Sequence, residues 1–161
     1  MRKEYSWEKN FFGTTTYLYH GGARVGNLVA KSFSGGAVGE MGGKVYEFRN
    51  SGILNLKTEV TEKATGKLVA TIRYNSFQTR ATIDTDERRL LWKSKNLLGS
   101  KWEMENSRGE RITYKGYNQK GVIETETDNE MLLLTGLFAR NYYWQSAFSM
   151  AAIFFLVFTR F

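Results

Sequence analysis

The stretch MLLLTGLFARNYYWQSAFSMAAIFFLVF, residues 131–158, decides the fold, because it is apolar on almost every side and carries a single charge, Arg140. A helix that is apolar all round lies either in a bilayer or in the core of a larger structure. The residues before this stretch are more polar, are punctuated by glycine and alternate like short strands. The environment of this one segment therefore determines the architecture of the whole chain.

The start of the helix is signalled by Thr127-Asp128-Asn129-Glu130, which has the Thr-x-x-Glu spacing of a capping box directly ahead of the apolar run. We therefore expect a helix over about 128–159. Gly136 and the pair Arg140-Asn141 are expected to bend or split it, because they interrupt the apolar pattern.

Two environments compete for this helix. A membrane-spanning helix needs about 20 mostly apolar residues, whereas the cleaner part, 142–158, has 17 and includes Gln145 and Ser149. Extending it back to residue 131 would place Arg140 in mid-span, where a charge costs several kcal/mol. We therefore favour a helix enclosed by sheet, and a C-terminal membrane anchor stays open as the alternative.

The central part of the chain predicts successive β-hairpins, with Asn, Asp and Gly in the turns between alternating runs. The predicted hairpins cover 59–74, 79–96 and 100–117, with further strands at 14–20, 28–33, 44–49, 53–60 and 122–126. The Gly-rich stretch 35–43 is expected to be a mobile loop. In the strand at 68–74, alternation directs Leu68, Ala70 and Ile72 inward.

These patterns predict a mainly β protein of one domain, 1–161, with strands over about 14–127 and the apolar C-terminal helix at about 128–159. The absence of helices between the predicted strands indicates an antiparallel barrel or sandwich. A barrel larger than eight strands can hold a helix. We therefore expect an antiparallel barrel of about ten to twelve strands, built from hairpins and enclosing the helix.

No residue pattern supports an enzyme, a cofactor or a metal site. The chain has no cysteine, which excludes disulfides and thiolate metal ligands, and its one histidine, His20, falls at a predicted turn. Glu124, Glu126 and Asp128 alternate along a strand, and we interpret them as a solvated face rather than a calcium site. The stretch 35–44 lacks the spacing of a phosphate-binding loop.

The net charge of +7 is concentrated between residues 88 and 120, where nine basic residues face three acids. Such a cluster indicates either an anionic partner or a solvated face. Alternation directs the basic side chains outward and the aromatic rings inward, so nucleic-acid binding by stacking is not expected. The candidate contacts with anionic lipid are Arg89, Lys93, Lys95, Lys101, Arg111 and Lys115.

The hairpins TEKATGKLVATI (61–72) and ENSRGERITYKG (105–116), followed by the apolar helix, resemble the tubby C-terminal-like superfamily. This superfamily includes the LURP-one-related proteins and the phospholipid scramblases. Over residues 14–158 the resemblance implies a roughly twelve-stranded barrel around a hydrophobic helix. It further implies a link to lipids, since tubby proteins bind phosphoinositides. Lipid scrambling is not expected, because the chain lacks the cysteine-rich and calcium-linked features near a scramblase helix.

We therefore expect a non-enzymatic binding module that docks reversibly on anionic lipid headgroups through the basic barrel face. The start of the chain is not followed by an apolar signal region, so we expect a cytoplasmic protein that is peripheral at the membrane. A tail-anchored protein with a β domain, a carrier of a small apolar ligand and a purely structural or interaction protein are the alternatives.

Overall fold

The structure is a computed structural model that describes residues 1–10, 13–31, 35–51, 56–75, 79–117 and 119–159, with only the backbone described for 145–154. The elements are β1 (Lys3–Lys9), β2 (Thr15–His20), β3 (Ala23–Ala30), β4 (Ala37–Met41), β5 (Lys44–Ser51), β6 (Lys57–Glu62), β7 (Leu68–Tyr74), β8 (Arg80–Asp84), β9 (Arg89–Ser94), β10 (Lys101–Asn106), β11 (Arg111–Gly116), β12 (Lys120–Thr125) and α1 (Glu130–Phe158).

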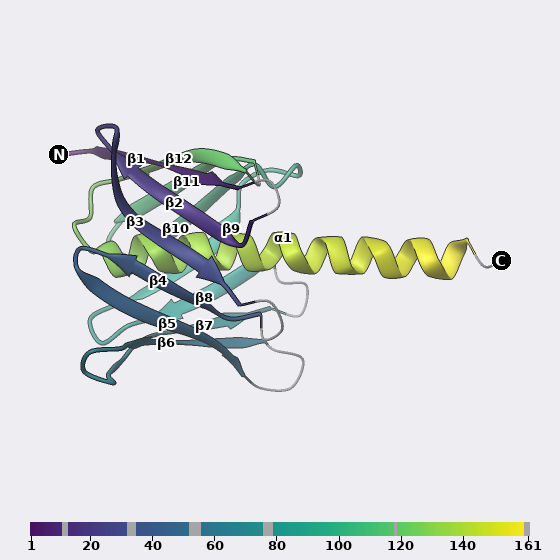
Figure 1. Cartoon of the computed structure of the whole chain (residues 1–161), viewed down its shortest axis with the longest axis horizontal. Coiled ribbons are helices and arrows are strands. Elements are labelled where there is room, and N and C mark those ends of the chain that lie inside the picture. Colours follow the sequence, from purple (N-terminus) through teal and green to yellow (C-terminus); the bar gives the residue numbers. More distant parts are fainter. Residues whose placement is uncertain (11–12, 32–34, 52–55, 76–78, 118, 160–161) are drawn as a thin grey trace.

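The twelve strands form one closed antiparallel barrel in which each strand pairs with its neighbours in the sequence (Figure 1). The first and last strands close it, with Tyr5 opposite Ile123 and Trp7 opposite Gly121. Helix α1 enters the barrel and packs inside it. The predicted fold class, an antiparallel barrel of ten to twelve strands enclosing the apolar helix, is confirmed.

Two strands were not expected from the sequence. Strand β1 lies ahead of the predicted strand region, although its alternation of buried Tyr5 and Trp7 with outward neighbours is a normal strand signal. Strand β4 occupies the Gly-rich stretch that was predicted to be a loop, so that prediction is wrong. A Cβ on Gly39 would lie only 3.2–3.3 Å from side-chain atoms of Leu28, Leu134 and Phe48, so glycine lets this strand approach the helix closely.

The helix begins differently from the prediction and is not broken. Asn129 is the N-cap, and its side-chain oxygen accepts a hydrogen bond from the Leu132 amide at 3.2 Å. The Thr127 hydroxyl instead accepts from the amide of Asn129, so the expected Thr-x-x-Glu box does not form. The helix runs without interruption through Gly136 and Arg140, which corrects the expected bend or split.

The barrel interior is filled by the first part of the helix. Met131, Leu132, Leu133, Leu134, Leu137, Phe138, Ala139 and Tyr142 are all buried among inward-facing strand residues. Phe138 stacks on Phe48 with ring centroids 4.8 Å apart, and Tyr142 stacks on Tyr74 at 4.5 Å. The strands and the helix therefore share one apolar core.

One inward assignment was wrong. Ala70 and Ile72 are buried as predicted, but Leu68 is exposed. The register between β6 and β7 shifts between Val60 and Thr61, so that Leu68 lies opposite Thr61 beyond the irregularity. A bulge of this kind redirects the side chain at the end of a strand.

The strand directions give the barrel two different ends. We call the end where α1 begins the entry end and the end from which α1 leaves the exit end (Figure 1). Hairpin turns with left-handed glycines, such as Gly43 and Gly66, close the entry end. The strands β1, β3, β5, β7, β9 and β11 all finish at the exit end.

Candidate functional site

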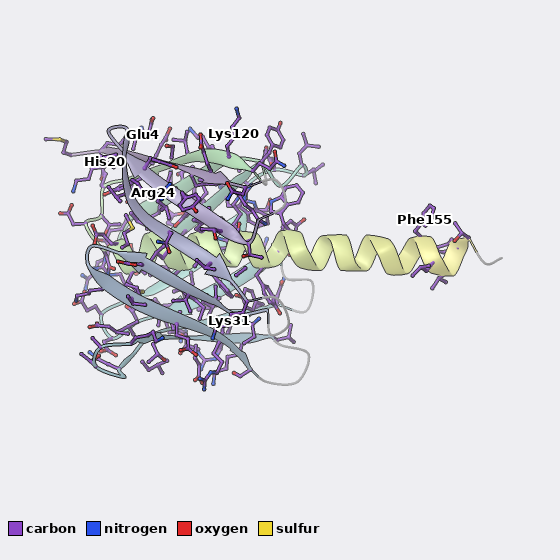
Figure 2. The ribbon with its side chains drawn as sticks, viewed as in Figure 1. Glu4, His20, Arg24, Lys31, Lys120 and Phe155 are labelled. Atoms are coloured by element: carbon purple, nitrogen blue, oxygen red, sulfur yellow. The ribbon has the colours of Figure 1, made fainter. Side chains whose placement is uncertain are left out.

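The C-terminal part of α1 projects out of the barrel into open space (Figures 1 and 2). The side chains of Phe155, Leu156, Val157 and Phe158 are between 51% and 72% exposed. Tyr143 contacts the barrel wall near this end, where its ring meets Trp102 edge-on at 4.5 Å. At 1.5 Å per residue, the helix from residue 145 to 158 extends about 21 Å beyond these contacts.

Other apolar side chains are exposed at the same end. Leu97 and Leu98, between β9 and β10, and Tyr117, between β11 and β12, are each at least 65% exposed. Large apolar side chains that gather on one part of a surface mark a binding site for protein, ligand or membrane. Among the described residues no helix is both long and apolar enough to cross a membrane.

The charges on the two ends of the barrel differ strongly. The sequences that join strands at the exit end, 9–15, 30–37, 51–57, 74–80, 94–101 and 116–120, contain no aspartate or glutamate. They contain seven basic residues, all within the described part of the chain, which we call the exit collar: Lys9, Lys31, Lys57, Arg80, Lys95, Lys101 and Lys120. The helix therefore leaves the barrel at a cationic end.

The entry end has the opposite character. Its connecting sequences, 20–23, 41–44, 62–68, 84–89, 106–111 and 125–130, carry eight acids: Glu62, Asp84, Asp86, Glu87, Glu110, Glu126, Asp128 and Glu130. Several of these acids form ion pairs, such as Lys67 with Asp86 at 2.7 Å and Arg88 with Glu110 at 2.7 Å. Positive and negative charge are thus mixed at this end.

Arg140 lies fully buried near the exit end. Its Nη2 donates to the Gly116 carbonyl at 3.3 Å, and its guanidinium carbon lies 4.7 Å from the centroid of the Trp7 ring. Burial lowers the pKa of Arg140 to about 10. Burial, followed by the charge of Arg140, also lowers the pKa of Lys9. The charge of Arg140, which disfavours a membrane span, therefore lies inside the barrel.

Five of the six predicted lipid contacts lie on the neighbouring strands β9, β10 and β11, and Lys95 directly follows β9, so the structure brings all six onto one side of the barrel. Lys101 and Lys115 are direct cross-strand neighbours. Lys93, Lys95, Lys101 and Lys115 lie toward the exit end, whereas Arg89 and Arg111 lie toward the entry end. An open recess of about 410 Å³ includes Lys101, Arg111 and Lys115 in its lining.

Acids on the same face balance most of these charges. The buried carboxylate of Glu103 lies 3.2 Å from Arg111 and 3.8 Å from Lys95, and Glu124 lies 3.1 Å from Lys115. Glu105, followed by Glu103, raises the pKa of Arg111.

The remaining three residues of the predicted set differ in their pairing. Arg89 pairs with Asp84 at 2.6 Å. Within the described residues, Lys93 and Lys101 have no ion-pair partner. The outer face of β9–β11 therefore carries paired acidic and basic side chains rather than a purely basic patch.

The other polar candidates make structural contacts. The Nδ1 atom of His20 lies 2.8 Å from the Glu4 carbonyl oxygen, and its ring packs on Tyr5. Glu124 pairs with Lys115 and Arg2, and Asp128 pairs with Lys3; these partners lower the pKa of both carboxyls. In the part of the chain that the structure describes, no three or more histidine or acidic side chains gather as a metal site would require.

The sequence reasoning missed the exit end as a site. Its signal is present in the sequence, because the six exit-end connections contain no acid, whereas four of the six entry-end sequences, 62–68, 84–89, 106–111 and 125–130, contain all eight. The difference can be interpreted only when an up-and-down barrel places every second connection at the same end.

The chain was compared with protein-family models, curated proteins and solved structures. No family model, no curated protein and no solved structure matches this chain.

Proposed function

We propose that this protein is a non-enzymatic membrane-binding module that inserts the projecting end of α1 into a phospholipid bilayer. The observation that carries the proposal is the exposure of four consecutive apolar side chains, Phe155 to Phe158, outside the barrel. Transfer of a large apolar side chain from water to an apolar phase contributes on the order of 1.5–3 kcal/mol when it is complete. Four partly exposed side chains together therefore supply a substantial driving force.

The length of the apolar end fits insertion into one leaflet. The sequence from 150 to 158, MAAIFFLVF, contains no polar side chain and extends about 13.5 Å as a helix. Half of a hydrocarbon core of about 30 Å is about 15 Å, so this segment stays within one leaflet. An oblique insertion fits best, because Arg160 follows two residues later in the sequence and a charge near the midplane costs several kcal/mol. Gln145, Ser146 and Ser149 precede this segment in the sequence, at the level where polar headgroups would lie.

The alternatives have different support. The tail-anchor hypothesis shares the exposed helix end, but it requires the helix to cross the bilayer, and the projecting part from 145 to 158 is about 21 Å long against a hydrocarbon core of about 30 Å. Docking through the basic barrel face is supported by Lys93 and Lys101, and opposed by the carboxylates that pair with Arg111, Lys95 and Lys115. A carrier of a small apolar ligand lacks a supporting observation, because α1 fills the described interior of the barrel.

We also propose membership of the tubby C-terminal-like superfamily. The support is the architecture alone, a closed barrel of twelve antiparallel strands around an apolar C-terminal helix. This helix continues well beyond the barrel, so the proposed membrane contact uses the helix end rather than only the barrel surface.

The test is flotation of the full chain with vesicles of phosphatidylcholine and phosphatidylserine. Leu156→Glu places a charge in the inserted segment and is expected to reduce the floated fraction at least tenfold. The matched control is Leu68→Glu, an exposed leucine at the entry end, which is expected to float like the wild type. Equal flotation of the wild type and Leu156→Glu would overturn the proposal.

Self-association through the helix end is the competing outcome. Light scattering during size-exclusion chromatography measures the mass of detergent-free wild type and Leu156→Glu. A wild-type oligomer that does not float with vesicles and that Leu156→Glu converts to a monomer would assign the helix end to protein contact instead.

A further inference from the structure

We infer that the exit collar forms an electrostatic docking surface for an anionic leaflet, so that the barrel stands end-on with its exit end against the headgroups. This inference rests on the proposed function, because insertion of α1 brings the exit end to the membrane. It adds the class of lipid and the orientation of the barrel, and it assigns the contact to the end of the barrel rather than to its β9–β11 face.

The charge around the projecting helix is positive. The six connecting sequences at the exit end carry seven basic residues and no acid. Within the described residues, Arg80, Lys101 and Lys120 have no ion-pair partner, and Arg80 and Lys120 are exposed. Lys31, Lys57 and Lys95 pair with glutamates at 3.5, 3.0 and 3.8 Å, and their side chains remain 35–46% exposed.

Exposed apolar side chains lie at the same end as the basic residues of the collar. Leu97, Leu98 and Tyr117 are exposed at the same end as the collar. Tyrosine favours the interface between headgroups and acyl chains, and lysine keeps its ammonium group at the polar level while its stem lies along apolar groups. Apolar tips, cationic side chains and a projecting apolar helix together match the layers of an anionic membrane surface.

The two ends of the barrel differ in charge. The entry end carries eight acids in its connecting sequences, so an anionic surface repels it relative to the exit end. The barrel axis follows the helix, and Figure 1 shows that the helix projects from the exit end only. The charge asymmetry and the helix therefore specify the same orientation.

Two matched pairs of substitutions test the collar. Arg80→Gln with Lys120→Gln removes one arginine and one lysine from the exit end. Lys63→Gln with Arg108→Gln removes the same two residue types from the entry end, where both are exposed and have no ion-pair partner within the described chain. All four side chains point to solvent, so the fold is expected to stay intact.

Binding is measured by titration with vesicles that contain phosphatidylserine and with vesicles of phosphatidylcholine alone. Each basic residue near an anionic surface changes the affinity about fivefold, so the exit-end pair is expected to lose on the order of 30-fold on anionic vesicles. It should lose less than about threefold on neutral vesicles, because the collar interacts with surface charge. The entry-end pair of substitutions should reduce the affinity less than about threefold for both anionic and neutral vesicles.

The orientation has its own readout, because the chain contains no cysteine and accepts a single label. An environment-sensitive fluorophore on Leu98→Cys is expected to shift to shorter wavelength when anionic vesicles are added. The same fluorophore on Leu68→Cys, at the entry end, should not shift.

The outcomes separate this inference from the proposed function. If Leu156→Glu abolishes flotation while the exit-end pair binds anionic vesicles like the wild type, the collar inference is wrong and membrane insertion stands. If both charge pairs weaken binding equally, or if the label at residue 68 shifts, end-on docking is wrong. If wild-type protein fails to bind either vesicle, both proposals are wrong.

Discussion

The Tyr114 ring on β11 occupies the space that a side chain on Gly136 of α1 would need. A Cβ built on Gly136 would lie 2.2 Å from the Tyr114 hydroxyl oxygen and 2.5 Å from its ring carbon Cζ. That hydroxyl donates to the Leu133 carbonyl at 3.0 Å, one turn earlier in the helix. Gly136 therefore sets the depth of the contact between the helix and the barrel wall.

Gly136→Ala is expected to destabilise the protein by about 1–3 kcal/mol, because the added methyl overpacks against a buried aromatic ring. Chemical denaturation measures the change. Gly39→Ala is the milder comparison and is expected to cost less, since its Cβ would lie 3.2–3.3 Å from side-chain atoms that need to shift by only a few tenths of an ångström. Equal stability of Gly136→Ala and wild type would show that the helix does not sit at this depth.

Arg140→Met is expected to raise the free energy of unfolding by about 1–3 kcal/mol near pH 8, because a buried charge that has no carboxylate partner among the described residues is replaced by an apolar side chain. Arg108→Met, at an exposed position, should leave stability unchanged.

The pH dependence of this gain follows from the lowered pKa of Arg140, which is about 10 in the folded protein. Below that pH the guanidinium is charged in both the folded protein and the unfolded chain, and burial of the charge destabilises the folded protein. Above it the folded protein releases the proton before the unfolded chain does, so the penalty declines. The difference in the free energy of unfolding between Arg140→Met and the wild type should therefore become smaller above about pH 10. A stability difference that grows above pH 10 would contradict the conclusion that burial of the charge destabilises the folded protein.

Two C-terminal deletions should separate folding from membrane binding. Deletion of 150–161 leaves the part of α1 that packs inside the barrel (Figure 1), so the thermal midpoint should change little while vesicle flotation is lost. Deletion of 142–161 also removes Tyr142 and Tyr143, which pack on Tyr74 and Trp102 at 4.5 Å each. Loss of a buried aromatic side chain costs about 3–5 kcal/mol, so this deletion should unfold at a much lower temperature. Similar midpoints for the two deletions would contradict the described packing.

Much of the fold could be predicted because its signals are local. Turn residues between alternating runs specified the hairpins 59–74, 79–96 and 100–117, since turn geometry and period-two burial depend on neighbours in the chain. Strand β4 was missed for a reason that is not local. Gly39 is a poor strand residue by itself, and only the close approach of Leu134 shows why glycine is required there.

The sequence by itself determined that this chain builds an antiparallel barrel with an apolar helix, because hydrophobic periodicity and turn chemistry act over a few residues. Only the tertiary structure decided where that helix is covered and where it is exposed. Arg140 and Phe155 belong to one continuous apolar run, yet the barrel buries the first and leaves the second in the open. The same closure gathers Lys31, Arg80 and Lys120, distant in the chain, at one end, because alternate connections of an up-and-down barrel meet there.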